Sequence, residues 1–441
     1  MIENSLNEQI KLVAEKFLEE TKDKEIQIIS HFDTDGIASA TIMIQTLKKL
    51  DKRFSVKIVK SLEEDFISNL PKDKLTIFLD LASGSLKHIE KYLNNVYIID
   101  HHEIVQEIPE NINIINPELH NKQKISASSL VYLFCNKLGK DKDRAKLAVL
   151  GMVGDLLEKE IDQLNNNILE DGEIKRKRGL LIYPSTRPLN RTLEFCSNPF
   201  IPGVTGDIKG VLELLREAGL NPIGGKYKNL IELNSEEMEK LVTAIMLRNP
   251  KAKHKEMIGD IFLIKLFNKL EDARELSAMI NACSRFGEPG IAIQLCMEIT
   301  GAKKRAESIH TKHKQFIVSG LKIIPEIPKI TGNGFVIINA KDKIKDNITG
   351  TITSILSKSS LYEEGTIITT MAYYDDKIKI SARTVGQNGQ NLREMLAKII
   401  TIIGGEVGGH KFAAGCIISK SKEQEFIDTL KKNLEVEVIK V

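Results

Sequence analysis

Three apolar segments in the N-terminal part of the chain each end in acidic or imidazole side chains. They are EIQIISHFDTDG (25–36), LTIFLDLASG (75–84) and NVYIIDHHE (95–103). In an open parallel sheet the carboxyl ends of the strands meet at one crevice, where ligands bind. The side chains that we expect to crowd this crevice are His31, Asp33, Asp35, Asp80, Asp100, His101 and His102.

Apolar runs alternate with helix-like segments throughout residues 25–116. The runs lie at 26–30, 56–60, 76–80, 96–100 and 112–116, and the helix-like segments between them include 36–50 and 83–95. This alternation predicts a parallel sheet flanked by helices. Further helices are expected at 126–140, where serines can cap the first turn, and at 141–160, which carries Asp155.

So many carboxylates and imidazoles in one small volume are costly without cations to neutralise them, so the pattern favours a metal site. Carboxylate and imidazole ligands suit Mn²⁺ and similar divalent ions. Asp80, from a central strand, could bridge a metal pair about 3.5–4 Å apart. Taken alone, HxDxDG could instead form a turn with an Asx-type hydrogen bond, and Asp100 could simply orient a histidine.

The rest of the chain predicts a connecting region and a second α/β domain. We expect short helices within 161–250, a long helix at 252–284 and another at about 290–319. Prolines and glycines mark a boundary near 320–333, after which strand-like runs return. A helix at 391–403 then precedes the glycine-rich segment GGEVGGHKFAAGCIIS.

Composition excludes some classes of protein and leaves others open. No apolar run reaches the roughly 18 residues of a membrane span, and the polar N-terminus is unlike a secretory signal. The five cysteines lack any CxxC spacing, so we expect neither a zinc site nor a disulfide framework, and a cytoplasmic location. The net charge of +3 does not decide a partner. Basic clusters such as KRKRG (175–179) could hold phosphates or form a solvated surface.

These motifs together resemble a known family. HFDTDG, the Asp80 strand end, DHH at 100–102, Asp155 in GMVGD and GGHKFAAG at 408–415 are similar to the motifs of DHH–DHHA1 phosphoesterases. Within that superfamily the chain most resembles archaeal RecJ-like exonucleases, including the GINS-associated nuclease group. The resemblance implies an N-terminal parallel-sheet DHH domain (1–160), a helical connecting or inserted region (161–320) and a smaller α/β DHHA1 domain (321–441).

The resemblance also implies a ligand set for two Mn²⁺ or Mg²⁺ ions. One ion would take His31, Asp33 and Asp80, and the other would take Asp35, Asp80, His101 and Asp155. Asp100 would orient His101 by accepting its other N–H, and His102 would face the substrate phosphate. Asp80, Asp100 and His102 are therefore the expected catalytic residues.

Other motifs are expected to bind the phosphates of the substrate. In the family the GGH motif, here Gly408, Gly409 and His410, binds substrate opposite the metals, which implies a cleft between domains. Further candidates are Arg383 in SARTV, Asn281 and Arg285 in NACSRFG, and Ser128 near the start of a helix. Arg383 could instead form a surface ion pair, and N-capping is an alternative for the serines at 126, 128 and 129. Ser284 replaces a family glycine, so this loop could differ.

Three functions are compatible with these residues. The first is a metal-dependent exonuclease on single-stranded DNA or RNA in replication or repair. The second is a phosphodiesterase for short oligonucleotides or cyclic dinucleotides, whose relatives are usually shorter. The third is a replication scaffold that binds GINS and MCM proteins, although every expected metal ligand is present here.

Overall fold

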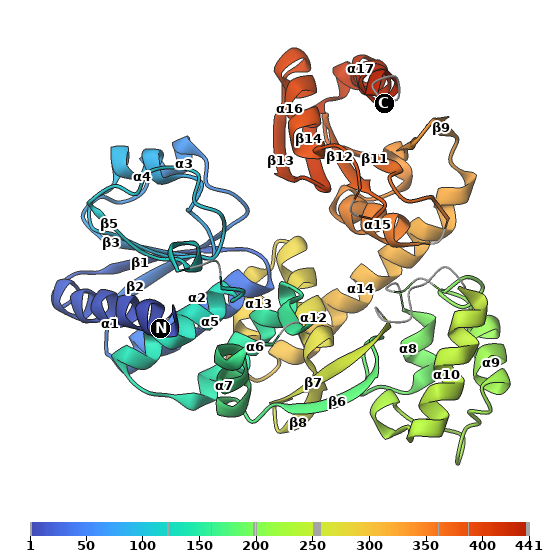
Figure 1. Ribbon diagram of the computed structural model, residues 1–441, viewed down its shortest axis with the longest axis horizontal. Coiled ribbons are helices and arrows are strands. Elements are labelled where there is room, and N and C mark those ends of the chain that lie inside the picture. Colours follow the sequence, from blue (N-terminus) through green and yellow to red (C-terminus); the bar gives the residue numbers. More distant parts are fainter. Residues whose placement is uncertain are drawn as a thin grey trace. The chain divides into compact units, whose positions relative to one another are not determined.

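The computed structural model describes residues 2–120, 123–159, 161–196, 199, 201–249, 257–359, 361–386 and 388–437 (Figure 1). It divides into two compact units, each assembled from two stretches of chain. One comprises Met1–Arg178 and Asp260–His310, and the other comprises Gly179–Gly259 and Thr311–Val441. The segment 161–320, which we predicted as one connecting region, thus contributes residues to both units.

The first unit contains the predicted parallel sheet, with five strands in the order β2-β1-β3-β4-β5. The strands are β1 (Ile26–His31), β2 (Phe54–Val59), β3 (Leu75–Leu79), β4 (Val96–Ile99) and β5 (Ile112–Ile115). Successive side chains of a strand point to opposite faces of a sheet. Accordingly, Ile28 packs into the core formed with α1 (Ile2–Glu20), α2 (Thr34–Lys49) and α5 (Ala127–Leu138). Ile29 packs into the opposite core, with α3 (Glu64–Ser68) and α4 (Leu86–Tyr92).

Three further helices of the first unit bear on the position of the candidate site. They are α6 (Ala145–Gly154), α7 (Gln163–Asp171) and α12 (Ala273–Arg285). Helix α6 lies against α2 and α5, and α12 lies against α6 and α2. The N-terminus of α2 and the C-terminus of α6 carry two of the acidic residues predicted for the site, Asp33 and Asp155.

The predicted long helix at 252–284 is wrong for residues 258–272 and is confirmed for 273–284, which lie in α12. The chain forms antiparallel strands β7 (Ile258–Leu266) and β8 (Lys269–Asp272) before α12 begins. Phe267 and Asn268 both have positive φ, 49° and 56°, which is the signature of a tight two-residue hairpin turn. The hairpin joins β6 (Lys175–Leu180) in a three-stranded sheet. The predicted helix at 290–319 is also two helices, α13 (Pro289–Cys296) and α14 (Ala302–Ile323).

The second unit contains a helical module and a mixed sheet. The helices of the module are α8 (Leu189–Glu194), α9 (Ile208–Glu217) and α10 (Ser235–Arg248). The sheet has six strands in the order β13-β14-β12-β11-β10-β9, of which only β10 and β11 are parallel neighbours. Its strands are β9 (Lys329–Gly332), β10 (Phe335–Asn339), β11 (Ile367–Tyr374), β12 (Lys377–Thr384), β13 (Glu406–His410) and β14 (Ala413–Ser419).

Helices cover both faces of this sheet. Helix α15 (Asp346–Lys358) packs on one face, and α16 (Leu392–Ile403) and α17 (Glu423–Glu437) pack on the other. The predicted fold class, a parallel-sheet domain followed by a smaller α/β domain, is confirmed. Among the described residues, no helix combines the length and apolarity needed to cross a bilayer.

Candidate metal centre

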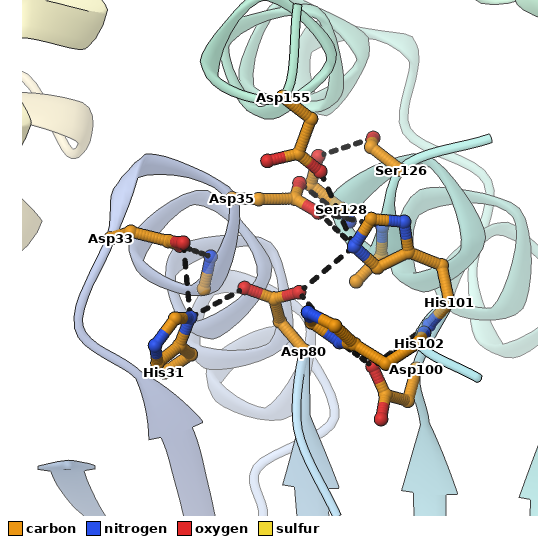
Figure 2. Close-up of polar contacts among 12 residues, drawn as sticks. His31, Asp33, Asp35, Asp80, Asp100, His101, His102, Ser126, Ser128 and Asp155 are labelled. Atoms are coloured by element: carbon orange, nitrogen blue, oxygen red, sulfur yellow. Dashed lines mark hydrogen bonds and ion pairs between the residues drawn. The ribbon is translucent and has the colours of Figure 1, made fainter. Parts of the chain in front are cut away.

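The candidate centre lies where β1, β3 and β4 end and where α2 and α6 begin or end (Figure 2). His31 is the last residue of β1, Asp33 caps the N-terminus of α2, and Asp155 caps the C-terminus of α6. Asp80 directly follows β3 with a φ of 59°, in the left-handed region that a residue with a Cβ rarely adopts. Such strained backbone is typical of functional sites.

One group of side chains surrounds the His31 ring. Its Nδ1 lies 3.0 Å from Oδ2 of Asp33 and 3.3 Å from Oδ2 of Asp80. A second group surrounds the His101 ring, whose Nε2 lies 3.4 Å from Oδ1 of Asp80 and 3.3 Å from Oδ2 of Asp155. The two carboxylate oxygens of Asp80 thus face different histidines.

Asp35 completes the second group, with Oδ2 at 4.0 Å from Nε2 of His101. Its carboxylate is fully buried and accepts hydrogen bonds from the backbone N–H groups of Ala127 (2.7 Å) and Ser128 (3.0 Å). These amides open α5, and the N-terminus of a helix stabilises negative charge. The first turn of α5 therefore holds Asp35 with its oxygens toward the cluster (Figure 2).

Ser128 does not lie where a substrate could reach it. Its side chain is fully buried, and its hydroxyl donates to the carbonyl of Ala148 at 3.1 Å. The prediction that Ser128 contacts the substrate is not supported by this position. Its backbone instead positions Asp35, while the side chain of Ser126 caps α5 by accepting from the N–H of Ser129.

Asp100 orients the neighbouring histidine rather than the predicted one. Its Oδ1 lies 2.7 Å from Nδ1 of His102 and accepts from the backbone N–H of His101 at 2.8 Å. Its Oδ2 accepts from the N–H of Ser83 at 3.0 Å. The prediction that Asp100 orients the His101 ring is therefore wrong. Oδ1 of Asp100 also accepts from the backbone N–H of His102 at 3.3 Å, so the chain turns after Asp100 and brings the His102 ring to its carboxylate.

Asn116 is a further member of this network that the sequence analysis did not select. It is fully buried, and its Nδ2 donates to the carbonyl of His102 at 2.9 Å and to Oγ of Ser83 at 3.0 Å. Asn116 directly follows β5, so the strand-end pattern that selected Asp80 also contained the signal for this residue.

Burial and like charges raise the proton affinity of the cluster. Burial, then the charges of Asp33 and Asp35, hold the pKa of Asp80 well above its usual range. Burial and the charge of Asp35 raise the pKa of Asp155 to about 10. Burial lowers the pKa of His31, but hydrogen bonds to Asp33 and Asp80 outweigh it and raise that pKa to about 10.

The donor set and its unmet polar atoms fit divalent metal ions. Oδ1 of Asp80 and Oδ2 of Asp155 are buried and accept no hydrogen bond within the described structure. Buried carboxylate oxygens without a donor are costly unless a cation or proton satisfies them. Ligand atoms within 4.8 Å of one another form three groups: His31–Asp33–Asp80, Asp35–His101–Asp155 and Asp80–His101–His102. The cluster therefore has the chemistry of a site for Mn²⁺ or Mg²⁺.

Two candidate phosphate ligands, Asn281 and Arg285, lie one helical turn apart on α12 of the same unit. Arg285 keeps an exposed side chain. Partial desolvation lowers the pKa of Arg285, and the negative charge of Asp33 opposes that shift. Arg285 is thus within electrostatic reach of Asp33.

The remaining candidates belong to the second unit. Arg383 on β12 is half-buried, and it donates to Oγ of Ser354 (3.0 Å) and to the carbonyl of Ala414 (3.2 Å). Gly408, Gly409 and His410 form the exposed end of edge strand β13, which pairs with β14. A Cβ on Gly409 would lie 2.4 Å from the carbonyl oxygen of Ala413, and its φ is 122°. Only glycine therefore allows this close strand pairing.

Models of three domains match successive parts of the chain. The DHH family N-terminal domain matches residues 25–154, the DHH-CID domain matches 182–258 and the DHHA1 domain matches 333–436. The first range contains every residue of the candidate centre except Asp155, which follows it directly. The chain belongs to the DHH–DHHA1 family, and its fold is that of the DHH–DHHA1 phosphoesterases.

Relatives and solved structures extend this likeness over nearly the whole chain. An uncharacterized protein of Methanocaldococcus jannaschii is 29% identical over 422 residues, covering 91% of each chain. The crystal structure of CDC45 from Entamoeba histolytica matches with a TM-score of 0.70 at 12% identity, covering 96% of this chain and 99% of that one. A crystal structure of exonuclease RecJ bound to manganese matches with a TM-score of 0.60 at 15% identity, covering 96% and 93%. At these identities the two structures establish a shared fold.

Proposed function

We propose that this protein is a two-metal phosphodiesterase that removes nucleotides from the end of single-stranded DNA or RNA. The observation that carries the proposal is the placement of Asp80, whose Oδ2 faces His31 and whose Oδ1 faces His101. A carboxylate with one oxygen directed to each of two ligand groups is suited to bridging a metal pair. The manganese in the RecJ crystal structure of the same fold supports this choice of ion.

The side chains divide into two ligand sets. His31, Asp33 and Asp80 would hold one Mn²⁺ or Mg²⁺ ion, and Asp35, Asp80, His101 and Asp155 would hold the other. When bound, two such ions lower the pKa of the attacking water and neutralise charge that develops on the phosphoryl oxygens. The amides at the start of α5 keep Asp35 directed at its site, and the Ser83 amide helps to fix Asp100.

His102 is the proposed contact to the phosphate being cleaved. The hydrogen bond from its Nδ1 to Asp100 raises the pKa of His102, which favours the imidazolium form. Its side chain is 42% exposed, so it can meet an anion beside the metals. A cation here would stabilise the negative charge of the transition state, the task that positioned donors perform in phosphoryl transfer.

The proposed contacts to neighbouring phosphates are cationic, amide or backbone groups. They are Asn281 and Arg285 on α12, Arg383 on β12, and Gly408, Gly409 and His410 on β13. Of these, the hairpin formed by β13 and β14 offers exposed backbone and the imidazole of His410. Contacts to several successive phosphates would favour a polymer over a dinucleotide.

Digestion of end-labelled strands tests the proposal. Matched single-stranded DNA and RNA would be incubated with the protein and Mn²⁺, beside short oligonucleotides and a cyclic dinucleotide, with Asp80→Asn as the control. We expect stepwise shortening of the long strands by the wild type and none by Asp80→Asn. Cleavage of dinucleotides alone would refute the exonuclease. Full activity of a folded Asp80→Asn protein would refute the two-metal arrangement.

A second candidate function is a scaffold in a replication complex, favoured by the likeness of the fold to CDC45. Its partners would be GINS and MCM proteins, and the same chain could serve both roles. Co-purification with either protein from a host expressing all three tests this function. Retention of that association by Asp80→Asn would separate the scaffold role from hydrolysis.

A further inference from the structure

Thr34 lies between two candidate metal ligands, Asp33 and Asp35, but points away from them toward another helix. Its hydroxyl donates to the backbone carbonyl of Ser277 on α12 at 3.0 Å. It also accepts from Oγ of Ser277 at 3.1 Å. Thr34 and Ser277 are 1% and 6% exposed, so water does not compete strongly for these two hydrogen bonds. The contact joins residues 243 positions apart in the sequence.

The space for this contact depends on a residue beside a third candidate ligand. Gly154 immediately precedes Asp155 at the end of α6. A Cβ at position 154 would lie 2.9 Å from Cβ of Thr34 and 3.6 Å from Oγ of Ser277. Three elements therefore meet at one tightly packed point: the start of α2 with Asp33 and Asp35, the end of α6, and α12.

The face of α12 that reaches Thr34 also carries the candidate phosphate ligands. Ser277, Asn281 and Arg285 are spaced four residues apart, and residues at this spacing lie on one side of a helix. Anchoring Ser277 therefore sets the position of Asn281 and Arg285 along the same surface. The charge of Asp33 acts to raise the pKa of Arg285, which is consistent with Arg285 lying on the surface of α12 near the metal ligands.

We infer that Thr34 and Ser277 are positioning residues that fix the first turn of α2, with its ligands Asp33 and Asp35, and the candidate phosphate-binding face of α12 relative to each other. Neither residue touches a metal or substrate in this assignment. Their hydrogen bonds would hold Asp33 and Asp35 in place from behind, and α12 in register with them. The inference rests on the proposed metal site, but it does not require that the substrate be a nucleic acid.

Removal of the Thr34 or Ser277 hydroxyl tests whether this pair positions the metal ligands. Thr34→Val keeps the shape of the side chain and loses both hydrogen bonds, whereas Ser277→Ala leaves the carbonyl that Thr34 bonds. Mn²⁺ affinity would be measured by calorimetry or by the EPR signal of free Mn²⁺, without any substrate. We expect Thr34→Val to weaken Mn²⁺ binding about 10-fold, as changes to groups that orient metal ligands do. Ser277→Ala should cause a smaller loss, and the double variant should match Thr34→Val because the two residues act through one contact.

Two variants separate positioning from general stability. Thr34→Ser keeps the hydroxyl and should restore Mn²⁺ affinity. Thr41→Val removes a buried hydroxyl of the same helix, which donates to the carbonyl of Ile37 at 2.8 Å, and should leave Mn²⁺ affinity unchanged. Wild-type affinity in Thr34→Val, or an equal loss in Thr41→Val, would overturn the inference. If Thr34→Val does not fold, Ser277→Ala decides the test in the same way.

A second measurement, of single-strand binding, tests whether Thr34 also positions α12. In EDTA, binding of a fluorescent single strand should weaken in Thr34→Val and in Arg285→Ala, and the double variant should be no weaker than Arg285→Ala. Additive losses would contradict the coupling between Thr34 and the α12 face. Absence of nuclease activity in the wild type would refute the proposed function, yet the Mn²⁺ measurements would still decide the role of this pair.

Discussion

Gly151 offers a sharp test of the way in which the fold holds Asp35. This glycine lies in α6, where it faces the first turn of α5. A Cβ at this position would lie 2.0 Å from Oδ1 of Asp35 and 2.0 Å from Oγ of Ser128. Real Cβ atoms do not approach other atoms so closely, so Gly151→Ala must displace the carboxylate, the serine or α6 itself.

The expected loss of stability in Gly151→Ala follows from the contacts that such a shift would break. Overpacking of a buried site costs about 1–3 kcal/mol. Loss of one backbone hydrogen bond to the charged carboxylate costs roughly 1.5–3 kcal/mol more. Alanine is a better helix former than glycine by about 1 kcal/mol, which offsets part of this. We therefore expect the free energy of unfolding to fall by roughly 1.5–5 kcal/mol. Affinity for Mn²⁺ should fall by about 10- to 100-fold, because a ligand loses its orientation.

Urea unfolding and Mn²⁺ titration measure these two effects. Gly139→Ala is a matched control, because Gly139 ends α5 and a Cβ there would meet no atom within 4 Å. We expect this control to change stability by no more than about 0.5 kcal/mol. A folded Gly151→Ala protein with wild-type stability and Mn²⁺ affinity would refute the argument that α6 and α5 together clamp Asp35.

Three further predictions concern other parts of the site. In EDTA, the free energy of unfolding should fall as pH rises from about 7 to 9. His31 and Asp155 have pKa values raised to about 10 in the folded protein, so they stay protonated over this range, whereas the same groups in the unfolded chain lose their protons. Urea unfolding at both pH values measures this, and constant or rising stability would contradict it. Asp100→Asn should lower kcat/KM about 10-fold or more, because it disturbs the hydrogen bonds that orient His102; steady-state kinetics with unaltered values would exclude that role. His410→Ala should raise KM for a single strand with little change in kcat, and an unchanged KM would remove His410 from the substrate contacts.

Much of the candidate site was predictable because strand ends in a parallel sheet share one edge. Asp80 needed only its position after an apolar run to be placed near His31, and the same reasoning extended to His101. Partners within the loops were not predictable in this way. Asp100 meets His102 and not the ring of His101, because the chain turns after β4 and the carboxylate accepts from the backbone N–H groups of both histidines.

Two other differences have separate physical causes. The hairpin of β7 and β8 was predicted as helix, because the turn at Phe267 and Asn268 lacks glycine and proline, and the flanking apolar residues also suit a helix. Ser128 was predicted to meet the substrate because serines near a helix start often bind anions. In this fold the anion at that helix start is the carboxylate of Asp35, which leaves no access for a phosphate.

The sequence by itself determined the fold class and most of the candidate metal ligands, because hydrophobic periodicity sets the strands and each ligand lies at or near the end of a strand or helix. Only the tertiary structure decided how those ligands are held. The two oxygens of Asp80 face different histidines, α5 secures Asp35, and α12 contacts the start of α2 through Thr34 and Ser277. These contacts join residues far apart in the chain, and their distances depend on packing that no local pattern encodes.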